Sequence, residues 1–320
     1  MGINIKKNLK KIIYYFASFN FLIKYQIKKI KNNQIIILNL HRVTDQKNSS
    51  YSPLSYKIFE KMIIFLTKNF KITTFSEVKN LPNCSKPLLI LSFDDGYDDF
   101  YTNVMPISKK YEFKVNLNII PNCIEKGEPP INILFQDFIY QVPLEKINQI
   151  SLENIVFKKK KNLSIYGNEL STFIKNKSYN DQIKLSEEIN KKYFSKFDFK
   201  KTKIMNKEQL IECASYHEIG VHSYFHSNMV YETNEFFIND TKKCLDWFKK
   251  NLNFKPKIYA FPNNSYREEQ IEILKQMGFE HILLVNDDFS IIGNTTYNRF
   301  NFYADSFNEA KCRAVGYKIK

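Results

Sequence analysis

Cysteine is scarce in this sequence, and its placement argues against two classes of protein. Only five cysteines occur in 320 residues, and no two of them are closely spaced. A scaffold held by disulfides needs pairs, and a zinc site built from thiolates needs a tightly spaced set. We therefore expect reduced thiols and a cytoplasmic protein. The cysteines are Cys84, Cys123, Cys213, Cys244 and Cys312.

Hydrophobic runs long enough to span a bilayer are also absent. The apolar run at 12–23 is flanked by lysines and is too short to cross a membrane. It resembles the hydrophobic part of a signal peptide, but no small-x-small cleavage site follows it. Two alternatives stay open, a helix lying in the membrane interface and a helix packed on the domain. We interpret residues 1–33 as a basic N-terminal segment that could make a peripheral contact with the inner membrane surface.

The positive charge is not accompanied by a nucleic-acid-binding motif. Lys and Arg total 48 against 33 Asp and Glu, which gives a net charge of +15. Such a surplus can favour phosphate, anionic lipid or acidic glycan, but most of it is lysine that accompanies abundant Ile, Asn, Phe and Tyr, and we interpret it as compositional drift of the whole proteome. Because no RNA-binding or helix-turn-helix signature is present, we expect no nucleic-acid partner. Hydrophobic residues make up 43% of the chain, which is enough for a sizeable core and argues against general disorder.

Strand and helix patterns alternate along most of the chain, which implies parallel β–α units. The helix at 55–70 has Ser55 as its expected N-cap, and Pro106 limits the regularity of the helix at 98–110. The expected strands are 34–40, 87–93, 113–120, 216–221, 257–261 and 281–285, and further helices are expected from Asn206, at 232–251 and at 266–277.

The stretch at about 122–205 breaks this alternation. It is rich in Lys and Asn, and helical patterns appear near 131–141 and 180–194. We predict a mainly helical insertion packed beside the main domain, where it can shape a substrate cleft. Residues 34–320 are expected to form the main domain, and the insertion interrupts it.

Polar residues cluster directly after the expected strands. Asp94 and Asp95 stop a buried run, and Gly96 permits the turn that would bring both carboxylates to one cleft. Close carboxylates repel unless a cation or a proton intervenes. One carboxylate serving a metal and the other serving as a base would resolve the conflict, whereas an ordinary acidic loop that caps a helix is the alternative.

A second cluster is the segment HSYFH at 222–226, which holds two of the five histidines. Imidazoles four residues apart can converge on one ion if the segment turns helically after its strand. Asp95, His222 and His226 together give three protein ligands with an open position, which is typical of a catalytic divalent metal site. Taken alone, the two histidines would more simply be buried and hydrogen-bonded to backbone.

The order of these segments resembles the polysaccharide deacetylase (NodB-homology) family, carbohydrate esterase family four. SFDDG at 92–96 is similar to its first motif, and HSYFH is similar to its second. LNLHRV at 38–43 resembles the Y-H-x-V segment of the branch that contains poly-N-acetylglucosamine deacetylases. The resemblance implies a distorted (β/α)7 barrel that removes N-acetyl groups from the sugars of a glycan.

The resemblance also implies residue roles. Asp95, His222 and His226 match the metal ligands, Asp94 matches the general base, and the divalent metal is usually zinc. The metal would polarise the acetamide carbonyl and acidify water. We predict that the backbone N–H of Tyr97 holds the oxyanion and assign Pro262 to substrate binding. His41 is the candidate acid for the leaving amine, with a strand-end histidine bonded to backbone as the alternative.

Two departures from the family pattern bear on activity. Ala260 occupies the place of an arginine that normally orients the base, and the usual C-terminal Leu-x-His segment is absent. Arg299 is predicted to supply the missing charge from a later strand, although a surface arginine is equally compatible with the sequence. The expected function is deacetylation in surface polysaccharide or lipopolysaccharide biosynthesis. An inactive glycan-binding protein and a metal-dependent amidase with a non-sugar substrate are the alternatives.

Overall fold

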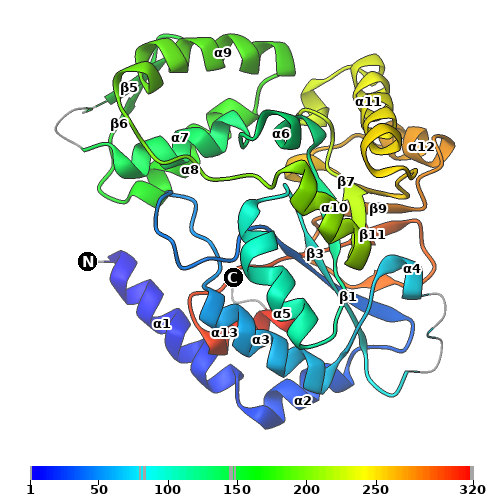
Figure 1. Cartoon of the computed structure of the whole chain (residues 1–320). Helices are drawn as coiled ribbons and strands as arrows, with labels where there is room; N and C mark the ends of the chain where they lie inside the picture. The colour runs from blue at the N-terminus through cyan, green and yellow to red at the C-terminus, as the bar shows by residue number, and fades with distance from the viewer. Residues whose placement is uncertain (1, 79–80, 82–83, 144–146, 148, 318–320) are drawn as a thin grey trace.

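The computed structural model describes residues 2–78, 81, 84–143, 147 and 149–317. Its main sheet has the strand order β10-β1-β3-β4-β7-β8-β9-β11, and seven of these strands run parallel (Figure 1). The parallel strands are β1 Gln34–Leu40, β3 Leu88–Phe93, β4 Asn116–Ile119, β7 Glu218–Val221, β8 Ile258–Ala260, β9 His281–Leu284 and β11 Thr296–Asn298. The short strands are β2 Lys71–Ile72, β10 Ser290–Ile291 and β12 Phe300–Asn301.

One short stretch of chain joins the two ends of the sheet. β11 pairs in parallel with β9, and β12, which follows after Arg299 alone, pairs in parallel with β1. The backbone N–H of Phe302 continues this contact by donating to Asn39 O at 2.9 Å. The sheet therefore curves into a barrel, and the predicted distorted (β/α) barrel is confirmed.

The interior of the barrel changes from apolar to polar along the strands. Residues two apart on a strand share a face, so Ile37 and Asn39 of β1 point the same way, as do Ile90 and Ser92 of β3. Ile37 and Ile90 belong to one buried apolar cluster, whereas Asn39 and Ser92 are buried polar residues. The amino ends of the strands are thus packed with hydrocarbon, and the carboxyl ends carry hydrogen-bonding groups.

Helices cover the outside of the sheet. Ser55 occupies the N-cap position of α3, but its side chain makes no capping hydrogen bond, whereas Asn206 and Gln209 form a full capping box on α10. A π-helical turn at Phe100–Val104 precedes α5, whose first turn contains Pro106. The helices are α3 Tyr56–Asn69, α4 Phe75–Val78, α5 Met105–Lys110, α10 Lys207–Tyr216, α11 Asn234–Leu252, α12 Glu268–Gln276 and α13 Phe307–Ala314.

The region between β4 and α10 has an apolar cluster of its own, and it lies above the barrel in Figure 1. Its α7 has the bounds expected from the sequence, and α9 lies where the second helical pattern was seen. The helix α8 and the hairpin of β5 and β6 were not expected. The elements are α6 Pro121–Lys126, α7 Ile131–Gln141, β5 Gln149–Leu152, β6 Ile155–Lys158, α8 Leu163–Lys175 and α9 Tyr179–Lys192.

The N-terminal segment forms two helices, α1 Gly2–Ala17 and α2 Asn20–Lys28, and α1 lies against α13. Tyr14 of α1 and Ile23 of α2 are buried in the main apolar cluster. In the described part of the chain, no helix combines the length and the hydropathy that crossing a membrane requires.

Candidate active site

A cleft of about 870 Å³ opens at the carboxyl ends of the barrel strands. Its floor contains Asp94, Asp95, His222 and Arg299, and His41 and His226 also line it. The α7–α8 region forms one wall, and the loop at 301–305 forms another. Residues predicted from four distant parts of the sequence therefore meet in one cavity.

Asp95, His222 and His226 converge on a common point. Asp95 Oδ1 lies 3.4 Å from His222 Nε2 and 3.4 Å from His226 Nε2. Ligand atoms that sit about 2.0–2.2 Å from one tetrahedral ion lie roughly 3.3–3.6 Å apart. Among the described residues, Asp95 Oδ1 is buried without a hydrogen-bond donor. An unpaired buried carboxylate oxygen at this spacing fits a zinc-sized cation.

The turn expected at Gly96 is present, and it is strained at Asp95 as well. Both Asp95 (φ 77°) and Gly96 (φ 81°) adopt left-handed backbone conformations. A Cβ atom at Gly96 would lie 3.3 Å from Ile119 Cγ2, so the position has little room as well as an unusual φ. Such strain at a non-glycine residue persists where the surrounding structure over-determines it.

The expected helical turn between the two histidines is wrong. The chain bends instead through Ser223 (φ 56°) and His226 (φ 58°), both in the left-handed region. Asp240 on α11 holds this bend, because its carboxylate accepts hydrogen bonds from the backbone N–H groups of Tyr224 and Phe225 at 2.9 and 3.2 Å. The imidazoles converge because a buried carboxylate fixes the loop between them.

Hydrogen bonding and burial prepare both imidazoles for a cation. His222 Nδ1 lies 2.9 Å from Ala260 O, and a proton donated along this contact leaves Nε2 free to face Asp95. Burial, opposed by Asp95, lowers the pKa of His226 to about 3, so this ring is neutral near pH 7. Neutral imidazoles are the form that binds metal.

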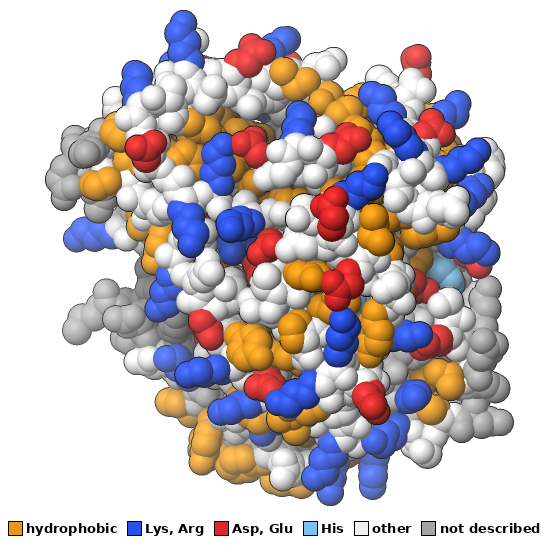
Figure 2. Space-filling view, viewed as in Figure 1, with side chains coloured by type: hydrophobic (Ala, Val, Ile, Leu, Met, Phe, Trp, Pro, Cys, Tyr) orange, Lys and Arg blue, Asp and Glu red, His pale blue; other side chains and the backbone are white. Residues whose placement is uncertain are grey.

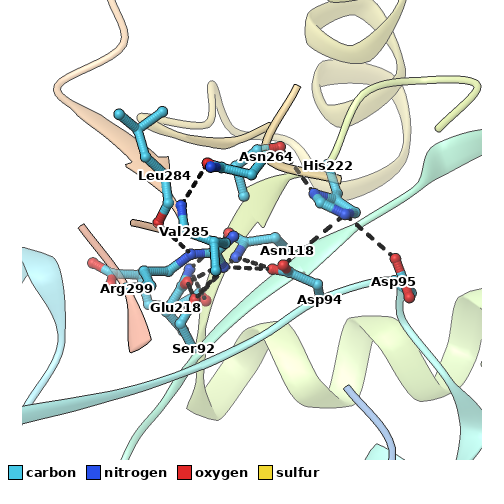
Figure 3. A network of polar contacts seen from close by, with 12 residues as sticks. Ser92, Asp94, Asp95, Asn118, Glu218, His222, Asn264, Leu284, Val285 and Arg299 are labelled. Atoms are coloured by element: carbon cyan, nitrogen blue, oxygen red, sulfur yellow. Dashed lines mark hydrogen bonds and ion pairs between the residues drawn. The ribbon is translucent and has the colours of Figure 1, made fainter. Parts of the chain in front are cut away.

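Asp94 lies beside the three converging groups and is held by a buried polar network (Figure 3). Its Oδ1 accepts hydrogen bonds from Asn118 Nδ2 and from Arg299 at 2.8 Å each, and Arg299 also donates to Ser92 Oγ at 3.0 Å. Its Oδ2 lies 4.0 Å from His222 Nε2. One oxygen is therefore occupied, and the other faces the candidate metal site.

The charge on Asp94 results from two opposing effects. Burial favours the neutral acid, but the Arg299 guanidinium holds the pKa of Asp94 well below its usual range. Arg299 is fully buried and forms its ion pair with Asp94 at 2.8 Å. A surface position for this arginine is excluded.

The other predicted residues lie at different depths. His41 lines the cleft with its ring against Tyr51, and burial lowers the pKa of His41, although Asp95 and Asp94 act in the opposite direction. Tyr97 and Pro262 are buried, and neither side chain lines the cleft. Tyr97 and Ile204 form an isolated antiparallel bridge, whose hydrogen bonds run from the N–H of Asp98 to Lys203 O and from the N–H of Met205 to Gly96 O. The N–H of Tyr97 takes no part in this bridge.

Several residues of the site were missed in the sequence. Asn118 and Ser92 support Asp94, and the alternation of polar and apolar residues in 113–120 was a signal for Asn118. Asp240 lies 14 residues after His226 in an ordinary amphipathic helix and gave no signal. Lys175 lines the cleft from α8, and burial, opposed by Asp95, lowers its pKa.

Comparisons with known proteins agree with this arrangement. The family model "Polysaccharide deacetylase" matches residues 173–282, which include both histidines of the site. No match was found among curated proteins. The matched segment begins within α8 and therefore does not include Asp94 and Asp95.

Solved structures share the fold over most of the chain. The Streptococcus pyogenes deacetylase PplD in complex with acetate is 15% identical, with 88% of this chain and 98% of that chain covered and a TM-score of 0.59. IcaB from Ammonifex degensii is 14% identical, with coverage of 89% and 99% and a TM-score of 0.55. A de-N-acetylase from Aggregatibacter actinomycetemcomitans is 14% identical, with coverage of 85% and 96% and a TM-score of 0.53. The match at residues 173–282 agrees with the resemblance seen in the motifs, and the solved structures show that the fold is shared.

Proposed function

We propose that this chain is a metal-dependent hydrolase that removes acetyl groups from N-acetylated sugars of a glycan. One observation carries the proposal. The unpaired Asp95 Oδ1 lies 3.4 Å from Nε2 of both His222 and His226, at the bottom of a cleft. This donor set, with an open side toward the cleft, suits a catalytic zinc ion.

A bound divalent cation would polarise the acetyl carbonyl and acidify the attacking water. Asp94 Oδ2 takes the proton of that water, and Arg299 keeps Asp94 ionised and fixes its orientation. The Tyr97 N–H stabilises the charge that develops on the carbonyl oxygen. His41, protonated in the substrate complex, gives its proton to the leaving amine, and the proton held by Asp94 returns to His41 through solvent after the products leave, so that both residues regain their starting state.

The α7–α8 region supports a sugar polymer as the substrate. It contributes Asn132, Gln136, Asn168 and Lys175 to the cleft, which are hydrogen-bonding groups suited to hydroxyl and acetamide oxygens. Solved structures of the same fold include a de-N-acetylase, which favours N-acetyl over O-acetyl groups. We extend the proposal to surface polysaccharide or lipopolysaccharide biosynthesis at the cytoplasmic side of the membrane.

The test is acetate release from N-acetylglucosamine oligomers and from an O-acetylated polymer, with added zinc. Asp94→Asn keeps the shape of the side chain but cannot accept the proton, and we expect a loss of roughly 10²–10⁴-fold. His281→Asn is the matched control, because His281 lies at the other end of the barrel. Equal acetate release from wild type and Asp94→Asn would remove the enzymatic proposal.

Ala260 favours a second candidate, an inactive glycan-binding protein. The missing arginine of the third motif would leave the base without a partner. Arg299 occupies that role geometrically, at 2.8 Å from Asp94, and argues for activity. Binding of the same oligomers without acetate release would support the inactive alternative.

A further inference from the structure

The two N-terminal helices use only one face to pack on the barrel. Tyr14, Ser18 and Ile23 are buried on that face. Lys311 Nζ of α13 donates to Ser18 O at 2.9 Å, and Cys312 Sγ of α13 lies 3.8 Å from Tyr14 O. The helices are therefore an attached part of the fold, and their opposite face is turned to solvent.

That opposite face carries a contiguous group of apolar side chains, which we call the aromatic patch. Of the 19 large hydrophobic side chains that are exposed in the described residues, seven lie within residues 9–25. Phe19 contacts Tyr15, Phe16 and Phe21 at ring separations of 5.5, 5.7 and 6.4 Å, so these rings form one surface. The patch consists of Leu9, Ile12, Tyr15, Phe16, Phe19, Phe21 and Tyr25, which are 39–67% exposed.

The geometry of α1 places a lysine at the edge of the patch. Leu9, Ile12 and Phe16 follow one another at three- and four-residue spacing and share a face of the helix. Lys10 and Lys11 are exposed, and Lys11 lies at the edge of the patch, four residues before Tyr15, whereas Lys10 lies four residues before the buried Tyr14. Figure 2 shows hydrophobic side chains along the lower edge of the molecule, where Figure 1 places α1 and α2. An apolar face bordered by lysines is typical of a helix that lies in a membrane interface.

The segment that carries the patch contains charged residues of one sign only. Residues 1–44 contain eight lysines and neither Asp nor Glu, although the whole chain has 33 acidic residues. Lys24, Lys28 and Lys29 extend the exposed basic border along α2. This border is complementary to an anionic surface.

We propose that α1 and α2 dock this protein on the surface of a bilayer that contains anionic lipid, with the aromatic patch in the headgroup region. The docking helices are also linked to the rim of the cleft. Tyr303 on the cleft rim stacks against the Arg313 guanidinium at 3.8 Å, and Arg313 lies 5.9 Å from the Tyr14 ring of α1. The rim and the docked helices are thus connected through one side chain, which suits a glycan carried on a lipid.

The experiment is sedimentation of the full chain with vesicles of phosphatidylcholine alone and with a third of phosphatidylglycerol. The test variant is Phe16→Ser/Phe19→Ser/Phe21→Ser. The matched control, Ile155→Ser/Val156→Ser/Ile211→Ser, removes three apolar side chains that are 47–50% exposed on other elements. Circular dichroism melting verifies that both variants are folded, and acetate release from a soluble oligomer is measured in parallel.

We expect the wild type and the control to bind the anionic vesicles, and the test variant to bind at least about tenfold more weakly. Binding should also fall with added salt, because the lysines contribute. Absence of wild-type binding, or equal binding by the test variant, would overturn the proposal. So would a dimer in analytical ultracentrifugation that only the test variant abolishes, because a second copy would then cover the patch. Retained acetate release in any of these outcomes would leave the proposed activity standing.

Discussion

The five histidines of this chain lie at two ends of one barrel and have different surroundings. His41 and His222 follow the carboxyl ends of β1 and β7, and His226 lies close behind. His217 directly precedes β7, and His281 begins β9, so both lie at the amino ends. Asp94 and Asp95 share the carboxyl end with the first group, whereas aromatic rings surround the second.

At the amino end, the polar atoms of His217 are satisfied by the fold itself. Its Nδ1 accepts from the backbone N–H of Val115 at 3.3 Å, and its Nε2 lies 3.2 Å from Ser108 Oγ. Burial lowers the pKa of His217 to about 4, much as burial lowers that of His226. A depressed pKa is therefore common to both ends. What distinguishes the cleft is an unpaired carboxylate oxygen between two imidazoles.

Replacing Arg299 tests the cleft side of this comparison most strongly. In Arg299→Met, Asp94 loses its cation, so its pKa rises and its orientation is less fixed. We expect kcat/KM to fall roughly 100-fold and the acid limb of its pH profile to move to higher pH. Arg299→Lys keeps the positive charge, so the acid limb of its pH profile should lie close to that of the wild type. An unchanged pH profile in Arg299→Met would contradict the assignment of Asp94 as the base.

Replacing His217 tests the amino end. Because the folded-state pKa is about 4, below the ordinary 6.5, the folded state resists protonation, and this stability is lost as pH falls from about 6.5 to 4. The wild type should lose up to about 3 kcal/mol from this group, and His217→Gln should not. Urea unfolding at several pH values measures the difference, and acetate release at pH 7 should remain close to wild type. If the difference in free energy of unfolding between the two proteins did not change with pH, a lowered pKa of His217 would be refuted.

Replacing Asp240 separates support of the site from the site itself. Asp240→Asn keeps the size of the side chain but can accept only one of the two backbone hydrogen bonds in the 224–225 segment. We expect zinc affinity to fall about 10–100-fold while the protein stays folded. Competition with a fluorescent zinc chelator measures this affinity, with Asp246→Asn on the same helix as control. Wild-type affinity in Asp240→Asn would show that the bend is held by other contacts.

Replacing Lys175 has the smallest expected effect. In Lys175→Met the cleft keeps its shape but loses an ammonium group that faces the substrate, so KM should rise by about tenfold or less with kcat little changed. Steady-state kinetics on oligomers of increasing length measures both constants. A fall in kcat alone would assign Lys175 to the chemical step instead.

Much of the barrel could be predicted because its signals are local. The run QIIILNL gave β1 its bounds, and the spacing of apolar residues gave α7 its bounds. The α8 helix was missed although Tyr166, Leu170 and Ile174 lie four residues apart and are buried in the apolar cluster of this region, so its apolar stripe was present in the sequence.

The residues that line the site could be predicted from the sequence, but the contacts that position them could not. Two acidic residues and two histidines after apolar strands are visible in the sequence. The left-handed bend at 222–226 and its dependence on Asp240 arise from contact between separate elements. Periodicity and residue spacing carry no information about such contacts, so neither could predict them. The closure of the sheet through Arg299 likewise depends on pairing with both β9 and β1.

The most direct measurement of the central claim is zinc binding by calorimetric titration of tag-free, metal-depleted protein. The wild type should bind one zinc ion per chain, and Asp95→Ala should lose more than about 100-fold in affinity. His281→Asn should bind as the wild type does, because its imidazole lies at the amino end of the barrel. Equal zinc affinity in Asp95→Ala and the wild type would contradict the account, because the ion would then bind elsewhere than between Asp95, His222 and His226.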